Sequence, residues 1–196
     1  MSRWIEPVTL EGEHVKLVPL AAEHEKALSA AAADGELWKL WYTSVPSPDT
    51  ARAYIEAAID MRERLGAHPF AVIDTKTGDI VGSTRYFNVE AAHRRLEIGH
   101  TWYAKRVQRT ALNTEAKLLL LGHAFDNLKA IAVEFRTHFM NHPSRAAIAR
   151  LGAKQDGILR NHQIGRDGAY RDTVVFSIIE SEWPAVRAHL KHRLDR

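Results

Sequence analysis

Hydrophobic and polar positions along residues 96–125 predict a strand, a polar turn and a buried helix in succession. The strand pattern covers residues 96–103, and most residues at positions 105–114 are polar or basic. The segment up to residue 125 then contains four successive leucines, at 118–121, and leaves only a narrow polar strip. A helix this apolar is expected to pack against a sheet.

The same reading divides the rest of the chain into strands and helices joined by short turns. Strands are predicted at residues 15–19, 70–74, 80–87, 130–138, 154–160 and 170–178, and helices at 21–33, 48–65, 145–152 and 181–193. Residues 76–79 form a hairpin turn, 88–95 a loop, and 165–168 a turn before the last strand. Residues 36–42 are unusually aromatic, which fits either core packing or the wall of a substrate cleft.

Length and composition limit the possibilities. The 196 residues suit one domain, 1–196, with a sizeable core. With no cysteine, disulfides, zinc-thiolate sites and a cysteine nucleophile are excluded. No apolar run is long enough to span a bilayer and the first ten residues lack the apolar centre of a signal peptide, so we expect a cytoplasmic protein. The net charge of +3 is too small for a dedicated nucleic-acid binder.

The turn before the central helix has the character of an anion site. Two basic residues, Lys105 and Arg106, stand near its start, and Gln, Arg, Thr and Asn follow. At the N-terminus of a helix the first backbone amides have no partner within the helix, and the helix dipole favours negative charge. Phosphate is the anion most often bound in such a place.

The sequence of this region resembles the GNAT superfamily of acyl-CoA-dependent N-acetyltransferases, and its ribosomal-protein (Rim-type) branch in particular. In that family the turn has the sequence motif Q/R-x-x-G-x-G/A, and the helix often begins with T-E-A. Here residues 108–113 read Q-R-T-A-L-N and residues 114–116 read T-E-A. In the register set by T-E-A, Arg109 stands where the family has its first glycine. Glycine permits a close approach and a positive φ, which arginine adopts only at a cost.

The resemblance implies an α/β GNAT-type fold, a mixed central sheet of six to seven strands flanked by helices, and acetyl-CoA as the cofactor. It also implies that the backbone of the strand binds the pantetheine arm, that amides of the turn hold the pyrophosphate, and that an asparagine before the late helix bonds the arm. The implied cofactor-binding residues are Thr101, Trp102, Gln108, Arg109, Thr110, Ala111, Leu112, Asn113, Thr114 and Asn141.

Glu97 is the candidate general base. Residues two apart on a strand share a face, so Glu97 is predicted to line up with Gly99, Thr101 and Tyr103. A carboxylate beside an apolar strand and facing a cleft would have a raised pKa and could deprotonate an incoming ammonium. The family often has a glutamate base on this strand. An edge charge paired with Arg94 or Arg95 is the competing interpretation.

Ser144 is the candidate acid. The family often carries a tyrosine on the late helix that protonates the leaving thiolate, but alignment on Gly152 puts Ile148 there, which cannot donate a proton. The Rim-type pattern N-x-x-S offers the hydroxyl of Ser144 instead. Ser144 could equally be a simple helix cap.

These features together predict an enzyme that acetylates a primary amine by direct attack, with a protein N-terminal α-amine as the favoured acceptor. The alternatives are a small amine (polyamine, amino acid or aminoglycoside), or a CoA-binding or RNA-associated module without turnover, which Arg109 and the missing tyrosine would favour. A homodimer is compatible with the sequence. The histidine pairs 138/142 and 189/192 lack a third ligand, so no metal is expected among the eleven histidines.

Overall fold

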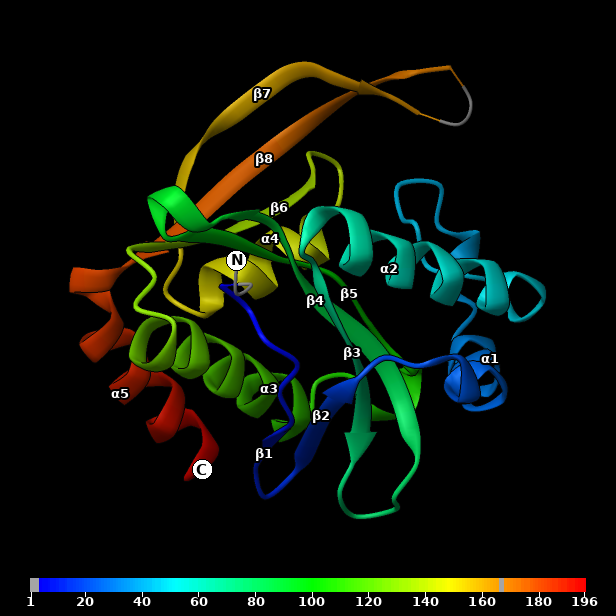
Figure 1. Cartoon of the computed structure of the whole chain (residues 1–196). Helices are drawn as coiled ribbons and strands as arrows, with labels where there is room; N and C mark the ends of the chain where they lie inside the picture. Colours follow the sequence, from blue (N-terminus) through cyan, green and yellow to red (C-terminus); the bar gives the residue numbers. More distant parts are fainter. Residues whose placement is uncertain (1–3, 166–167) are drawn as a thin grey trace.

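The computed structural model describes residues 4–165 and 168–196, which form a single mixed sheet with helices on both faces (Figure 1). Within these residues the sheet has eight strands in the order β1-β2-β3-β4-β5-β6-β8-β7. The strands are β1 (Leu10–Glu11), β2 (Val15–Pro19), β3 (His68–Asp74), β4 (Ile80–Glu90), β5 (Arg95–Tyr103), β6 (Ala132–His138), β7 (Lys154–Ile164) and β8 (Tyr170–Ile179). Neighbouring strands are antiparallel except for β5 and β6, which are parallel.

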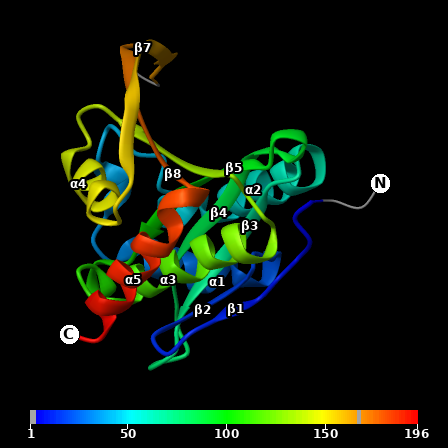
Figure 2. The ribbon, with the colours of Figure 1, turned by 90° about the vertical axis from the view of Figure 1, so that its left-hand side faces the viewer.

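Helices α1 and α2 cover one face of the sheet, and α3 and α5 cover the other (Figures 1 and 2). The helices are α1 (Glu25–Ala33), α2 (Ala51–Leu65), α3 (Ala111–Gly122), α4 (His142–Arg150) and α5 (Trp183–Leu194). A π-helical turn, His123–Asn127, continues α3. The far end of the β7–β8 hairpin extends well beyond the other strands (Figure 1).

The observed elements follow the sequence pattern closely, with differences where local polarity misleads. The sheet has one strand more than the predicted six to seven, because the two-residue β1 pairs with β2 and is too short to show a period. The predicted loop at 88–95 is also wrong in part. β4 runs on to Glu90 and β5 begins at Arg95, because backbone pairing continues although the side chains of Asn88 and Glu90 are polar and exposed.

Helix α3 begins at Ala111, three residues before the T-E-A sequence. Thr110 is its N-cap and accepts a hydrogen bond from the amide of Leu112 at 3.3 Å. Leu120 and Leu121 are fully buried in the main core, and the hydroxyl of Tyr86 on β4 donates to the carbonyl of Leu120 at 2.6 Å. The predicted packing of this helix against the sheet is therefore confirmed.

The glutamate of T-E-A has a structural role. The carboxylate of Glu115 accepts hydrogen bonds from the amides of Glu13, His14 and Val15 at 2.9, 2.6 and 3.0 Å. It thereby ties the turn between β1 and β2 to α3. A Cβ on Gly12 would lie 2.4 Å from this carboxyl carbon, so any larger residue at that position would displace the carboxylate.

Candidate active site

The cleft of the molecule opens where β5 and β6 diverge. Their parallel pairing ends at Glu97 and Glu134, while β6 continues beside β8 as far as His138. A cavity of about 660 Å³ follows this divergence and is lined by both strands, by α3 and α4, and by the segments 41–45 and 162–165. The backbone of β5 beyond residue 97 is thus separated from β6, as a strand that binds a cofactor arm requires.

A bulge in β5 changes which side chains face each way. Ser83 pairs with Trp102 and Arg85 with Gly99, so β5 has one more residue than β4 in this interval. His100, at φ 49°, lies in the bulge. The predicted shared face of Glu97, Gly99, Thr101 and Tyr103 is therefore wrong beyond Gly99.

Thr101 accordingly points to the opposite face, the one covered by α3. Its Oγ1 lies 2.7 Å from Oγ1 of Thr84, and Lys117 Nζ on α3 donates to it at 3.0 Å. Both Thr101 and Lys117 line the cleft. The cleft is therefore lined from both faces of the sheet. Thr101 and Lys117 line it on the face covered by α3, and Glu97 lines it on the opposite face.

Glu97 is the acidic group that lines this cleft. It is 3% exposed, and Asn88 Nδ2 donates to its Oε2 at 2.8 Å. Burial raises the pKa of Glu97 to about 7, although Asn88 and the guanidinium of Arg136, 3.5 Å away, both favour the ionised form. The competing interpretation is wrong: the basic partner of Glu97 is Arg136, and Arg95 pairs with Glu134.

The turn before α3 keeps the conformation that a glycine would give. Arg109 has a φ of 63°, in the left-handed region that costs a non-glycine residue about 1 kcal/mol or more. Its side chain is exposed. Gln108 turns back, and its Nε2 donates to the carbonyl of Tyr103 at 2.9 Å. Arg109 therefore keeps the turn in a conformation that favours glycine. Counted from Gln108, however, the first glycine of Q/R-x-x-G-x-G/A falls at Ala111, so its assignment to position 109 is wrong.

The first turn of α3 offers amides for an anion. In this turn the amide of Leu112 donates a hydrogen bond to Oγ1 of the N-cap Thr110. The amides of Ala111 and Asn113 have no partner within the helix. The side chains of Leu112 and Thr114 are buried, so only their backbones could contribute. Thr114 follows the first turn and is the least suited of the predicted set.

Orphaned polar atoms near this turn fit a polar ligand. The buried Oδ1 of Asn113, Nε1 of Trp102 and OH of Tyr103 have no hydrogen-bond partner among the residues that the structure describes, and all three residues line the cleft. Buried polar atoms are normally paired, so an unpaired group of them indicates a ligand-binding surface. A cofactor arm with amides and hydroxyls would meet these atoms.

Helix α4 contributes two of the predicted residues. Asn141 caps it, because its Oδ1 accepts from the amide of Ser144 at 3.1 Å. The capping side chain is therefore that of Asn141 and not that of Ser144. Ser144 and Ile148 both line the cleft, so the serine hydroxyl is available on the wall where isoleucine cannot donate.

The mouth of the cleft has aromatic walls. Trp41 is 66% exposed, and its ring lies edge-on to His138, with centroids 4.9 Å apart. Tyr42 lies beside both, and Ile164 and Tyr170 of the β7–β8 hairpin are exposed on the other side. The cleft-wall interpretation of the aromatic segment is confirmed for its last two residues. Of the turn predicted at 165–168, residues 166–167 lie outside the described residues.

Comparison with known proteins identifies the chemistry of this cleft. The Acetyltransferase (GNAT) domain matches residues 14–154. The chain belongs to this family. Its members are acetyl-CoA-dependent N-acetyltransferases, so the cleft is that of such an enzyme.

Individual relatives agree with this assignment. The chain is 28% identical over 148 residues to the Bacillus subtilis (strain 168) protein named "Putative ribosomal N-acetyltransferase YdaF", covering 73% of this chain and 78% of that protein. A crystal structure of a "putative acetyltransferase" from T. thermophilus is 36% identical, with a TM-score of 0.84 over 97% of this chain and 99% of that chain. RimJ of Mycobacterium smegmatis, solved "in complex with CoA-disulfide", is 23% identical, with a TM-score of 0.78 over 97% and 96% of the two chains. The name of the B. subtilis protein agrees with the resemblance to the Rim-type branch, and the likeness to RimJ shows the same fold.

Several side chains of this GNAT cleft did not emerge from sequence reasoning, among them Lys117 and the hydroxyl of Tyr103. Lys117 is, with Glu115, one of two charged residues at buried positions of an otherwise apolar helix, and that contrast was the available signal. Tyr103 gave no signal, because an aromatic residue at the end of a strand usually belongs to the core.

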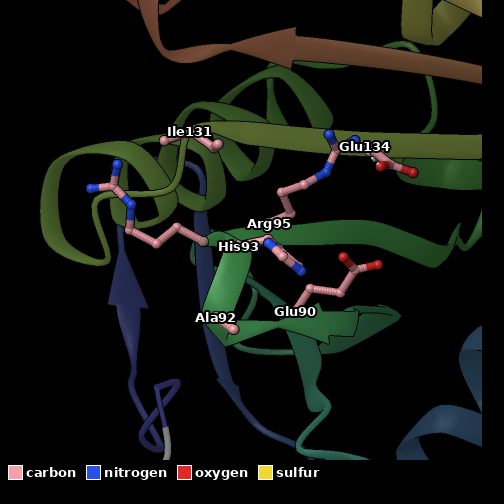
Figure 3. A pocket seen from close by; sticks show the side chains of 7 residues that line it. Glu90, Ala92, His93, Arg95, Ile131 and Glu134 are labelled. Atoms are coloured by element: carbon pink, nitrogen blue, oxygen red, sulfur yellow. Dashed lines mark hydrogen bonds and ion pairs between the residues drawn. The ribbon is translucent and has the colours of Figure 1, made fainter.

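A second cavity lies at the opposite end of β5, where β5 and β6 are still paired (Figure 3). Its volume is about 670 Å³, and its lining residues are Glu90, Ala92, His93, Arg94, Arg95, Ile131 and Glu134. Arg95 reaches toward Glu134, with which it forms an ion pair (Figure 3). Glu134 also binds Arg136 at 2.9 Å, so this surface supports the ion pairs behind Glu97.

The described residues contain no group of three or more His, Cys, Asp or Glu side chains arranged to hold a metal ion. Over residues 4–165 and 168–196, no helix has the length and apolar character needed to cross a membrane.

Proposed function

We propose that this enzyme transfers the acetyl group of acetyl-CoA to the N-terminal α-amine of a protein, with Glu97 as general base. The observation that carries the proposal is a buried carboxylate with a pKa of about 7 at the point where β5 and β6 diverge. A base works best when its pKa lies near the working pH, since it is then both ionised and able to accept a proton. The name of the B. subtilis relative supports a ribosomal acceptor.

Residues of the cleft divide into binding and proton-transfer roles. The amides of Ala111 and Asn113, with Arg109 beside them, would hold the diphosphate, and the backbone at Thr101 and Trp102 would hold the pantetheine arm. When bound, acetyl-CoA supplies the acetyl group as a thioester. The first turn of α3 and the divergent edge of β5 thus fix the position of the donor before an acceptor arrives.

Proton transfer falls to two side chains on different elements. An α-amine enters as an ammonium, and Glu97 takes its proton directly or through one water molecule. Arg136 and Asn88 keep the carboxylate oriented through their contacts with Oε2. On α4 the hydroxyl of Ser144 donates a proton to the departing sulfur.

Ser144→Ala is expected to lower kcat by about a hundredfold, the low end of the range for one positioned acid–base group, and to leave the Kd for CoA unchanged. Turnover and calorimetric titration with CoA measure the two quantities. Ser181→Ala is the matched control, because Ser181 is exposed and does not line the cleft. Unchanged turnover, or a change in CoA affinity alone, would assign Ser144 to packing.

The choice of acceptor is tested by thiol release from acetyl-CoA with a panel of amines. A peptide with a free N-terminus is expected to be acetylated, and the same peptide with a blocked N-terminus is not. A polyamine, an amino acid and an aminoglycoside complete the panel. Release with one of these small amines but not with the peptide would contradict the proposed acceptor. Binding of acetyl-CoA without release on any amine would contradict the catalytic role of Glu97.

A further inference from the structure

Lys117 is a buried lysine in the cleft that the proposed reaction does not use. Its side chain is 6% exposed, it lines the cleft from α3, and its Nζ donates to Thr101 at 3.0 Å. Thr101 bonds Thr84 in turn. Among the described residues no carboxylate forms an ion pair with Lys117. The ammonium form is therefore left with hydroxyl partners only.

A buried ammonium without a counter-ion is costly, and a lysine responds by losing its proton. Burial lowers the pKa of Lys117 to about 7, and no charged neighbour contributes to this change. About half of the molecules at neutral pH would then carry a neutral amine at this position. A neutral amine is the species that attacks a thioester.

We propose that Lys117 is a self-acetylation site, with Nζ taking the acetyl group of acetyl-CoA when no acceptor amine occupies the cleft. The inference rests on the proposed function only for the position of the donor beside Thr101. Attack forms the bond between Nζ and the carbonyl carbon and breaks the bond from that carbon to sulfur. The electron pair leaves with sulfur, and the proton lost by Nζ converts the thiolate to free CoA.

The product is a stable amide and not an intermediate of the main reaction. Acetylation removes the titratable group from the α3 wall and adds a bulky neutral group beside Thr101. The modified enzyme is therefore expected to bind CoA more weakly. An excess of donor over acceptor would thus slow the enzyme.

The neighbouring lysine provides the comparison. Lys105 is exposed in the turn before α3, so it lies near the same donor but in water. Burial in the cleft and the contact with Thr101 distinguish Lys117 from Lys105, so Lys105 is expected to react more slowly. Lys105→Arg is therefore the matched control for Lys117→Arg.

The experiment incubates the full chain with acetyl-CoA and without an acceptor, and follows acetylation by peptide mass spectrometry. We expect one acetyl group, on the peptide containing Lys117, at a rate at least about tenfold above that for Lys105. Lys117→Arg should abolish it and Lys105→Arg should not. An added acceptor amine or excess CoA should suppress it in the unsubstituted protein, which tests the idea even if the arginine variant folds poorly.

Two results would overturn the inference. One is an unmodified Lys117 in protein that binds CoA by calorimetry. The other is an equal rate of acetylation after the protein has been unfolded in urea, since reaction would then not depend on the cleft. Absence of CoA binding would instead contradict the proposed function. Turnover of an amine without modification of Lys117 would contradict this inference alone.

Discussion

Replacing Glu97 by glutamine is expected to lower kcat/KM for amine acetylation by about a hundredfold or more, the usual contribution of a positioned general base. Glutamine has nearly the same shape and can still accept the hydrogen bond from Asn88, but it cannot take up a proton. The Kd for CoA should not change, because Glu97 is not among the residues proposed to bind CoA. Steady-state kinetics and calorimetric titration measure the two effects.

The dependence on pH gives the sharper test of this residue. Since the pKa of Glu97 is raised to about 7, the carboxylate is mostly protonated below pH 7, and the rate should rise as pH rises through 7. Below that pH, log kcat/KM of the unsubstituted enzyme should climb by about one unit more per pH unit than that of Glu97→Gln. Equal slopes would remove Glu97 from the mechanism.

Stability separates loss of chemistry from loss of fold. A carboxyl group whose folded pKa is raised stabilises the fold less as pH rises from its ordinary range through about 7, because the folded state must then bury the charge. At pH 8 Glu97→Gln should therefore be at least as stable as the unsubstituted protein. Glu134→Gln is the matched control. This variant should keep most of the activity. The rise of kcat/KM with pH should occur at a slightly lower pH, because the charge of Glu134 raises the pKa of Glu97.

Glu115→Ala is expected to reduce the free energy of unfolding by about 2–4 kcal/mol, because three backbone amides lose their acceptor in a largely buried place. Urea unfolding measures this change. Glu115→Gln keeps one acceptor oxygen, so its free energy of unfolding should lie between those of the unsubstituted protein and Glu115→Ala. A change below about 0.5 kcal/mol for the alanine variant would mean that water replaces the carboxylate, and that T-E-A does not anchor the β1–β2 turn.

Sequence periodicity was sufficient for the larger elements of this fold. The apolar face of α3 and the apolar positions along β2 to β6 and β8 are strong signals, because each of these elements buries side chains in the core. β1 is too short to carry a period, and the extension of β4 to Glu90 depends on backbone pairing that side chains do not encode. Tertiary context decided these ends.

The site was predictable where a residue type was unusual for its place. A glutamate within an apolar strand marked Glu97, and a polar turn before an apolar helix marked the anion site. The bulge at His100 could not be foreseen, because one extra residue in β5 leaves no trace in the sequence, yet it reverses the faces beyond Gly99. The same bulge turns Thr101 toward Lys117, so the sequence does not reveal that these two side chains meet.

The central claim is that the entrance to α3 and the divergence of β5 from β6 together aim a thioester at Glu97. A crystal structure with CoA bound tests this most directly. We expect the diphosphate on the amides of Ala111 and Asn113, and the sulfur within the cleft between β5 and β6. Density for CoA elsewhere, or protein side chains that fill the entrance and leave no path to Glu97, would contradict the account.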